Sequence, residues 1–466
     1  MKEEIKSVYL IAICGTGMTA LAGLLKEKGY QVSGSDLNVY PPMSTFLAEN
    51  GIPVHIGYAE NHLDSSPDLV VIGNSMSRGN PEVEAVLERK LRYVSLPFAL
   101  REFFIRGSYS CVVTGTHGKT TTSSMLAWVL ENAGRDPGFF VGGIPQNFGR
   151  GFKVGGGQYF VSEGDEYDSA FFDKGSKFLH YLPDLAILNN VEFDHADIFG
   201  TLEDIKTTFR RMINLIPRNG HLVVCWDDPL ARELSAGAHC NLITFGLSEG
   251  AMWQAKKLSY SEAGMQFDIL HNGTRFARAT TPLHGEHMAR NCLAVAASGD
   301  ALGLKAQEIT AGLATFKNVM RRMQFKGERD GVKVFDDFAH HPTEIKATLS
   351  AMQARFPDAR VFAVFEPRTA TSKRDVFQKQ FVDVFSRADH VVFAPPFAIE
   401  KVPEPERLSI DKVVAGIRNQ GVPCEVLPAN DQMVGYLRQH TAPGDVVLFM
   451  SNGDFNQIPL KFLNVT

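Results

Sequence analysis

Apolar runs alternate with amphipathic stretches along the first hundred residues. Strand patterns occupy three short segments, at residues 8–13, 30–36 and 69–72. Helical patterns follow at residues 20–28 and 81–90. Such an alternation of strands and helices predicts a parallel sheet whose ligand site lies at the carboxyl ends of the strands.

The same alternation starts again near residues 108 and 322. The second unit has strand patterns at 110–114, 159–161, 185–188 and 221–224, helices at 119–132 and 287–302, and short β segments within 251–282. The third unit has strand patterns at 332–337, 360–364 and 446–450 and a helix at 342–353. We therefore predict an α/β fold of three domains: a Rossmann-like domain over residues 1–107, a P-loop-type domain with a parallel sheet and a small β excursion over 108–321, and a second Rossmann-like domain over 322–466.

The composition narrows the class of protein. A length of 466 residues fits about three domains of ordinary size, and 44% hydrophobic with 21% charged residues is typical of globular proteins. With a net charge of -5 the protein has no excess of positive charge to attract nucleic acid or anionic lipid, so we expect neither a nucleic-acid nor a membrane partner. Six scattered cysteines, no apolar run of about 18 residues and no signal peptide favour a cytoplasmic protein.

The strongest motif is TGTHGKTTT at residues 114–122, between a predicted strand and a predicted helix. Its glycines let backbone N–H groups surround a phosphate, Lys119 reaches the terminal phosphates, and a threonine hydroxyl can ligate magnesium. The usual pattern has glycine at position 113, where this chain has valine. We predict a nucleoside-triphosphate site made by Gly115, Thr116, His117, Gly118, Lys119, Thr120 and Thr121. The simpler alternative is a glycine-rich turn that binds nothing.

A second glycine-rich turn follows the first strand. Gly15, Gly17 and Ala20 form a GxGxxA pattern, and Asp36 ends the next strand about 20 residues further on. This dinucleotide fingerprint by itself predicts an NAD-dependent oxidoreductase, and that alternative stays open, as does a tight turn without a ligand. Because the chain also has a triphosphate loop, we interpret the turn as the site of a nucleotide-linked substrate.

Acidic and imidazole groups follow strands in the second and third units. Glu163 is the leading candidate for a magnesium ligand, because magnesium at an ATP site prefers carboxylate oxygens. His195 is a weaker candidate, because a histidine beside aspartates is often only hydrogen-bonded. Arg368 follows a strand of the third unit, where it either orients a further reactant or lies on a solvated loop. His340 and His341 are adjacent on a loop and point apart, which argues against a shared metal.

Taken in this order, the motifs resemble the Mur ligase family of peptidoglycan synthesis over nearly the whole chain. The resemblance is carried by residues 15–36, 74–75, 80–82, 115–121, 163, 194–195, 285–291, 321–322 and 336–343. Within the family, residues 38–44, 165–174 and 192–199 resemble the branch that recycles a murein tripeptide.

This resemblance implies an ATP-dependent, ADP-forming ligase that makes a C–N bond. It would join L-Ala-γ-D-Glu-meso-diaminopimelate to UDP-N-acetylmuramate through an acyl phosphate, with ATP and Mg²⁺ or Mn²⁺ as cofactors. The alternative within the family is the UDP-N-acetylmuramate:L-alanine ligase of de novo synthesis. A non-catalytic nucleotide-binding regulator is the alternative from another class.

The resemblance also implies roles for individual residues. The implied catalytic residues are Lys119, His195, Arg322 and His341. Beyond the phosphate loop, the implied ATP-binding residues are His287, Asn291, Arg322 and Asp336. The implied metal ligands are Thr120, Glu163 and His195, and the implied amine-substrate residues are Arg368 and His341. The implied UDP-sugar residues are Gly15, Thr16, Gly17, Met18, Asp36, Asn74 and Ser75. Met288 stands where the family often has asparagine.

Overall fold

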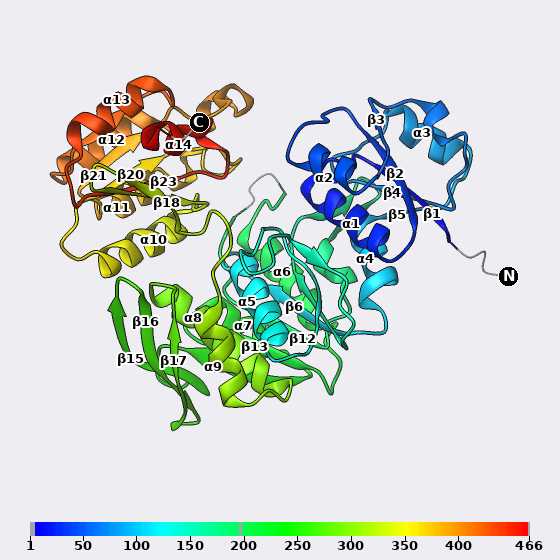
Figure 1. Cartoon of the computed structure of the whole chain (residues 1–466), viewed down its shortest axis with the longest axis horizontal. Helices are drawn as coiled ribbons and strands as arrows, with labels where there is room; N and C mark the ends of the chain where they lie inside the picture. The colour runs from blue at the N-terminus through cyan, green and yellow to red at the C-terminus, as the bar shows by residue number, and fades with distance from the viewer. Residues whose placement is uncertain (1–4, 195–197, 465–466) are drawn as a thin grey trace.

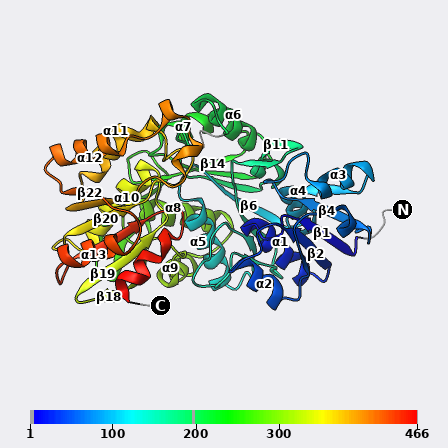
Figure 2. The same cartoon turned by 90° about the horizontal axis from the view of Figure 1, so that it is seen from above.

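The computed structural model describes residues 5–194 and 198–464 and contains three α/β units. The N-terminal and C-terminal units lie at opposite ends of the molecule, and both contact the central unit between them (Figures 1 and 2). Among the described residues, no helix combines the length and the apolar character needed to cross a bilayer.

The N-terminal unit is built on a five-stranded parallel sheet of order β3-β2-β1-β4-β5. Its elements are β1 (Ser7–Ile11), α1 (Thr16–Glu27), β2 (Gln31–Asp36), α2 (Met43–Glu49), β3 (Val54–Ile56), β4 (Leu69–Ile72), α3 (Pro81–Glu88), β5 (Tyr93–Ser95) and α4 (Leu96–Leu100). The residues of β4 are fully buried, as expected for a strand covered on both faces.

The central unit has a ten-stranded sheet of order β17-β16-β15-β14-β13-β12-β6-β9-β7-β8, besides a two-stranded hairpin, β10-β11. Its strands are β6 (Tyr109–Thr114), β7 (Gly138–Phe140), β8 (Phe152–Lys153), β9 (Tyr159–Glu163), β10 (Asp168–Ala170), β11 (Asp173–Ser176), β12 (Leu185–Leu188), β13 (His221–Cys225), β14 (Asn241–Gly246), β15 (Trp253–Ser261), β16 (Gly264–His271) and β17 (Thr274–Thr281). Its helices are α5 (Lys119–Asn132), α6 (Leu202–Ile213), α7 (Pro229–Ser235), α8 (Glu286–Ala301) and α9 (Ala306–Thr315). The β excursion predicted near residues 251–282 is therefore the antiparallel meander β15–β17, which extends the main sheet.

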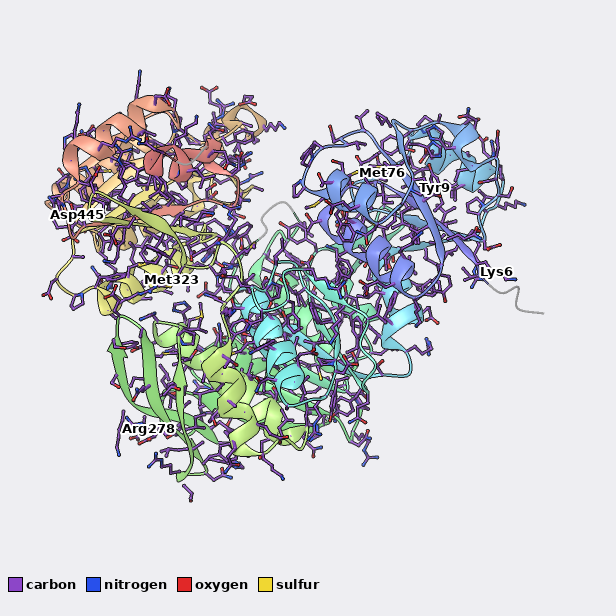
Figure 3. All side chains as sticks on the ribbon, viewed as in Figure 1. Lys6, Tyr9, Met76, Arg278, Met323 and Asp445 are labelled. Carbon is purple, nitrogen blue, oxygen red and sulfur yellow. The ribbon has the colours of Figure 1, made fainter. Side chains whose placement is uncertain are left out.

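The C-terminal unit has a six-stranded sheet of order β18-β19-β23-β20-β21-β22, parallel except for β18. Its elements are β18 (Gln324–Arg329), β19 (Val332–Asp337), α10 (Pro342–Arg355), β20 (Val361–Phe365), α11 (Gln378–Phe385), β21 (His390–Phe393), α12 (Ile410–Asn419), β22 (Cys424–Val426), α13 (Asp431–His440), β23 (Val446–Met450) and α14 (Ile458–Leu463). Met323, labelled in Figure 3, lies where the chain enters this unit, and its N–H donates to Asp337 at 2.6 Å.

The first strand and the first helix differ from their predicted bounds. The apolar pattern continues to Ile13, but β1 ends at Ile11 because Ala12 has a φ of 68°. The N–H groups of Ala12 and Ile13 both donate to the carbonyl of Ser35 at the end of the sheet. The helix then begins at Thr16, after Gly15, so the glycine-rich turn is shorter than the sequence pattern indicates.

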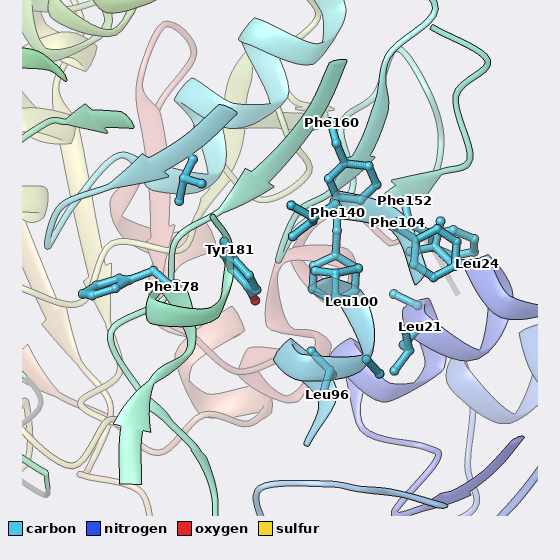
Figure 4. Packing of buried hydrophobic residues seen from close by; sticks show 14 of the residues in the cluster. Leu21, Leu24, Leu96, Leu100, Phe104, Phe140, Phe152, Phe160, Phe178 and Tyr181 are labelled. Carbon is cyan, nitrogen blue, oxygen red and sulfur yellow. The ribbon is translucent and has the colours of Figure 1, made fainter. Parts of the chain in front are cut away.

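The central unit contacts its two neighbours in different ways. One apolar cluster continues from the N-terminal unit into the central unit, and Figure 4 shows Leu21 and Leu24 of α1 near Phe140 and Phe152. The apolar clusters of the C-terminal unit are separate from this shared cluster. The C-terminal unit reaches the central one through hydrogen bonds such as Thr371 to Asp194 at 3.0 Å. Polar contacts of this kind separate more easily than a shared apolar core.

Candidate active site

Asn190 and two glycines fix the shape of the loop between β6 and α5. Gly115 has a φ of 127° and Gly118 a φ of 78°, which L side chains rarely adopt. A Cβ on Gly115 would also lie 3.0 Å from the backbone of Asn190. The N–H of Thr116 donates to the Asn190 carbonyl at 3.0 Å, and the N–H of His117 donates to its side chain at 2.7 Å. The predicted phosphate loop thus leads directly into the N-terminus of α5, where an anion is favoured.

Lys119 lies at this helix N-terminus in contact with an acid. Its Nζ donates to the carbonyl of Gly115 at 2.7 Å and lies 2.9 Å from Glu166 Oε2. Burial disfavours the ammonium, but the charges of Glu166 and Asp165 outweigh burial and raise the pKa of Lys119. The lysine is therefore fully charged at neutral pH and available to a phosphate.

Thr120 and Glu163 bring two oxygen donors together beside the loop. The Thr120 hydroxyl donates to Glu163 Oε1 at 2.8 Å, and the N–H of Gly142 donates to Oε2 at 2.6 Å. Burial raises the pKa of Glu163. A hydroxyl and a carboxylate are ligands that Mg²⁺ prefers, so these residues fit the predicted metal. The third predicted ligand, His195, lies outside the described residues.

A cavity of about 670 Å³ opens next to the loop, between the central and C-terminal units. The start of α8 contributes His287 and Asn291 to it, and Asn291 also lies close to the predicted loop, since a Cβ on Gly118 would be 3.3 Å from its Oδ1. Burial, Arg290 and Arg322 lower the pKa of His287 to about 4, so its ring is neutral. Met288 also lines the cavity. Only 4% of its surface is exposed, and it belongs to an apolar cluster of the central unit.

His117 connects the phosphate loop to both neighbouring walls of the cavity. Its Nε2 lies 3.0 Å from Glu192, and its Nδ1 lies 3.3 Å from Glu344 of α10. Burial opposes the charged ring, but the hydrogen bonds to Glu192 and Glu344 outweigh it and raise the pKa of His117 to about 9. A protonated His117 therefore joins the central unit to the C-terminal unit.

His341 precedes α10 and faces the same acid. Its Nδ1 accepts a hydrogen bond from the N–H of Thr343 at 3.2 Å and lies 3.6 Å from Glu192. Burial, followed by the charge of His117, lowers the pKa of His341 to about 4. One ligand atom from each of His117, Glu192 and His341 lies within 4.8 Å of the others. These three residues are thus close enough to share a metal ion, although Nδ1 of His341 is already engaged by the backbone.

Of the predicted residues Arg322 and Asp336, one lines the cavity and the other does not. Arg322 lines the cavity, 3.8 Å from Glu344. Asp336 does not line the cavity and pairs with Arg321 at 3.2 Å, whereas Asp337, the next residue, does line it. Burial raises the pKa of Asp337 to about 6.

Arg368 follows the carboxyl end of β20 and is not among the residues that line the cavity. Its guanidinium lies 3.4 Å from Glu366 and stacks on the ring of Phe397 at 3.9 Å. The loop that follows Arg368 touches the central unit, because Thr371 donates to Asp194. The structure therefore places Arg368 in a loop that contacts the central unit.

The predicted UDP-sugar residues gather at the carboxyl end of the N-terminal sheet. Gly15, Thr16, Gly17 and Met18 lie between β1 and the first turn of α1. Asp36 accepts hydrogen bonds from the N–H groups of Cys14 at 2.9 Å and Asn38 at 3.0 Å, so it also holds the turn together. Asn74 and Ser75 follow β4, and Asn74 Nδ2 donates to the carbonyl of Asp168 in β10 at 3.4 Å.

Glu166, Glu192 and Glu344 are acids of the site that were not predicted as site residues. All three contact predicted residues, and two of them belong to the stretches that follow strands. Their position directly after β9 and β12 is the signal that could have identified Glu166 and Glu192. Glu344 lies in the first turn of α10 and carries no comparable signal.

Three family models match the chain in succession. They are described as "Mur ligase family, catalytic domain" over residues 7–107, "Mur ligase middle domain" over 113–299 and "Mur ligase, glutamate ligase domain" over 321–453.

Individual relatives match nearly end to end. The UDP-N-acetylmuramate--L-alanyl-gamma-D-glutamyl-meso-2,6-diaminoheptandioate ligase of Escherichia coli is 40% identical, covering 98% of this chain and 97% of the relative. A UDP-N-acetylmuramate--L-alanine ligase of Acetivibrio thermocellus is 34% identical over 99% of this chain and 96% of its own. The crystal structure of a murein peptide ligase from Psychrobacter arcticus is 35% identical, with a TM-score of 0.71 and 98% of both chains covered.

Proposed function

The chain belongs to the Mur ligase family, and from that premise we propose that it joins L-Ala-γ-D-Glu-meso-diaminopimelate to UDP-N-acetylmuramate at the expense of ATP. In this proposal residues 1–107 hold the UDP-sugar, residues 108–321 hold ATP and metal, and residues 322–466 hold the peptide. One observation carries it: the phosphate loop and the start of α10 face each other across a single cavity of about 670 Å³. The relative from Escherichia coli, named for this pair of substrates, supports the choice of peptide.

The first chemical step transfers a phosphoryl group. The lactyl carboxylate of UDP-N-acetylmuramate attacks the γ-phosphorus of ATP. The bond from that phosphorus to the β–γ bridging oxygen breaks, so that ADP leaves and an acyl phosphate forms. The N–H groups in the first turn of α5, together with the ammonium of Lys119, would hold the phosphates, and the neutral His287 and Asn291 would contact the base. Catalysis of this step depends mainly on the position of the phosphates and on the charge around them, which the rigid phosphate loop and Lys119 supply.

Mg²⁺ or Mn²⁺, when bound, would neutralise charge on the transferring phosphoryl group. Thr120 and Glu163 are the described residues that would hold it, with His195 as the third predicted ligand.

The second step forms the amide bond. The free amine of the L-alanine residue attacks the acyl carbonyl, a proton leaves the nitrogen, and inorganic phosphate departs. Water would destroy the acyl phosphate, so contacts that close the C-terminal unit over the central one protect it. His117 with Glu344, and Thr371 with Asp194, are such contacts. Arg368 and His341 would orient the peptide.

The experiment is a phosphate-release assay with purified protein, ATP, Mg²⁺ and UDP-N-acetylmuramate, with either the tripeptide or L-alanine added. We expect a much larger kcat/KM for the tripeptide. A preference for L-alanine would instead support the de novo alternative and leave the fold and the chemistry unchanged.

Two other classes are tested in the same preparation. Family membership argues against the NAD-dependent oxidoreductase, and a change in nicotinamide absorbance without ATP would revive it. A non-catalytic regulator would bind ATP and release no phosphate with either amine.

A further inference from the structure

The β10–β11 hairpin leaves the central unit and ends on the N-terminal unit. Its two strands form a sheet of their own, apart from the ten-stranded sheet, and the turn between them consists of Phe171 and Phe172. Strand β10 contacts α4, the helix of the N-terminal unit that follows β5. Figure 2 shows β11 where the central and N-terminal units meet.

The tip of the hairpin packs on apolar side chains of the N-terminal unit. Phe171 lies against the apolar cluster formed by β1, β4 and α3. The ring of Phe172 meets the ring of Tyr93 in β5 edge to face, with centroids 5.0 Å apart and an angle of 84° between the planes. Aromatic pairs in this arrangement contribute stabilisation beyond the area that they bury. The tip therefore fixes the hairpin to the N-terminal unit.

The hairpin also contacts one of the predicted UDP-sugar residues. Asn74 follows β4, and its Nδ2 donates to the carbonyl of Asp168 in β10 at 3.4 Å. Strand β4 pairs with β5, which carries Tyr93. The hairpin thus contacts two neighbouring strands of the N-terminal sheet, and one of these contacts lies at the carboxyl edge where the UDP-sugar residues gather.

The base of the hairpin is joined to the phosphate loop. The Ser176 hydroxyl donates to the carbonyl of Glu166 at 2.6 Å, and the N–H of Lys177 donates to the carbonyl of Tyr167 at 3.0 Å. The carboxylate of the same Glu166 lies 2.9 Å from Nζ of Lys119. The hairpin therefore connects the ammonium of the ATP site to the edge of the UDP-sugar site.

A second contact between the two units lies elsewhere. The shared apolar cluster joins α1 to Phe140 of β7 and Phe152 of β8, as Figure 4 shows. One contact alone would leave the N-terminal unit free to tilt about it, and the contact of the hairpin with β4 and β5 opposes that tilt.

We propose that the β10–β11 hairpin positions the UDP-sugar against ATP, with Phe172 as a positioning residue. The inference rests on the proposed function, in which different units hold the two nucleotides. A tilt of one unit against the other would move the lactyl carboxylate away from the γ-phosphorus, and a displacement of about 1 Å can lower a rate about 100-fold. Phe172 acts through the placement of the N-terminal unit and takes no part in the bond-forming steps.

The test compares Phe172→Ala with Phe325→Ala in the full-length enzyme. Phe325 is a suitable control, because it is 51% exposed on β18 and its ring contacts Phe335 at 5.4 Å within the C-terminal unit. For Phe172→Ala we expect kcat for phosphate release to fall about 10-fold or more, with the calorimetric Kd values of ATP and UDP-N-acetylmuramate at the wild-type level. Phe172→Tyr keeps the ring and should retain most of the rate, and Phe325→Ala should leave kcat unchanged.

A double-mutant cycle assigns the effect to the contact. Tyr93→Leu should also lower kcat, and adding it to Phe172→Ala should lower kcat no further. An unchanged kcat in Phe172→Ala would overturn the inference and leave the placement of the N-terminal unit to the shared apolar cluster. Additive losses in the double variant, or a weaker Kd for both nucleotides together with a lower melting temperature, would also overturn it. Failure of the proposed function would show separately, as wild-type enzyme that does not use the tripeptide.

Discussion

The contact between Lys119 and Glu166 gives a prediction that separates stability from catalysis. The two groups lie 2.9 Å apart, and their side chains are 11% and 3% exposed. Lys119→Met deprives Glu166 of its ammonium partner while keeping much of the lysine's volume. Breaking a buried pair from one side costs about 3–5 kcal/mol, because the remaining charge stays in a poorly solvated place.

The size of this effect can be measured. For a unit of roughly 200 residues, about 3–5 kcal/mol lowers the melting temperature by about 6–20 °C. The double variant Lys119→Met/Glu166→Gln removes both charges and should recover most of this loss. Neither variant should release phosphate, since both lack the ammonium that we propose contacts the terminal phosphates. Binding of UDP-N-acetylmuramate to the N-terminal unit should persist in both.

The assays are thermal unfolding, phosphate release and calorimetric binding of UDP-N-acetylmuramate. Arg210→Ala is the matched control, because Arg210 pairs with Glu203 at 2.6 Å on the surface of the same unit, with 43% and 61% exposure. Its loss should cost less than about 1 kcal/mol. A Lys119→Met protein as stable as the wild type would refute the argument from burial. Turnover by the double variant would refute the role of Lys119.

Three further predictions concern the same region. Glu163→Gln should raise the Mg²⁺ concentration needed for half-maximal activity by about 10-fold or more, because it removes a charged ligand. A Mg²⁺ titration of activity at saturating ATP measures this effect. An unchanged titration curve would exclude Glu163 as a ligand. His117 has a pKa of about 9, above its ordinary 6.5, so the stability it contributes is complete below pH 6.5 and is lost as the pH rises through 9. Melting temperatures measured between pH 6 and 9.5 should show this loss in the wild type and not in His117→Asn, and parallel curves would contradict the assignment. Gly115→Ala should weaken ATP binding, because a φ of 127° strains any L side chain and a Cβ would press on the Asn190 backbone at 3.0 Å and shift the loop. Gly134→Ala, which also has a positive φ but nothing within 4 Å, should cost about 1 kcal/mol of stability and leave ATP binding intact.

Local signals in the sequence were sufficient for several elements. Strand β4 and helices α5 and α10 begin where the pattern predicts, because an apolar run, a glycine turn or a proline at the first helical turn marks each start. The end of β1 was wrong by two residues. Its apolar pattern continues, but the backbone leaves the strand conformation at Ala12, where φ is 68°, and the N–H groups of Ala12 and Ile13 both donate to the carbonyl of Ser35.

The chemistry of the site divides in the same way. The sequence by itself determined the phosphate loop, since its glycines, lysine and threonines are contiguous and act through their own backbone. Only the tertiary structure decided that Glu344 and Glu192 share His117. The energy of a charge depends on which groups surround it in a region of low dielectric constant, and segments distant in the chain supply those groups.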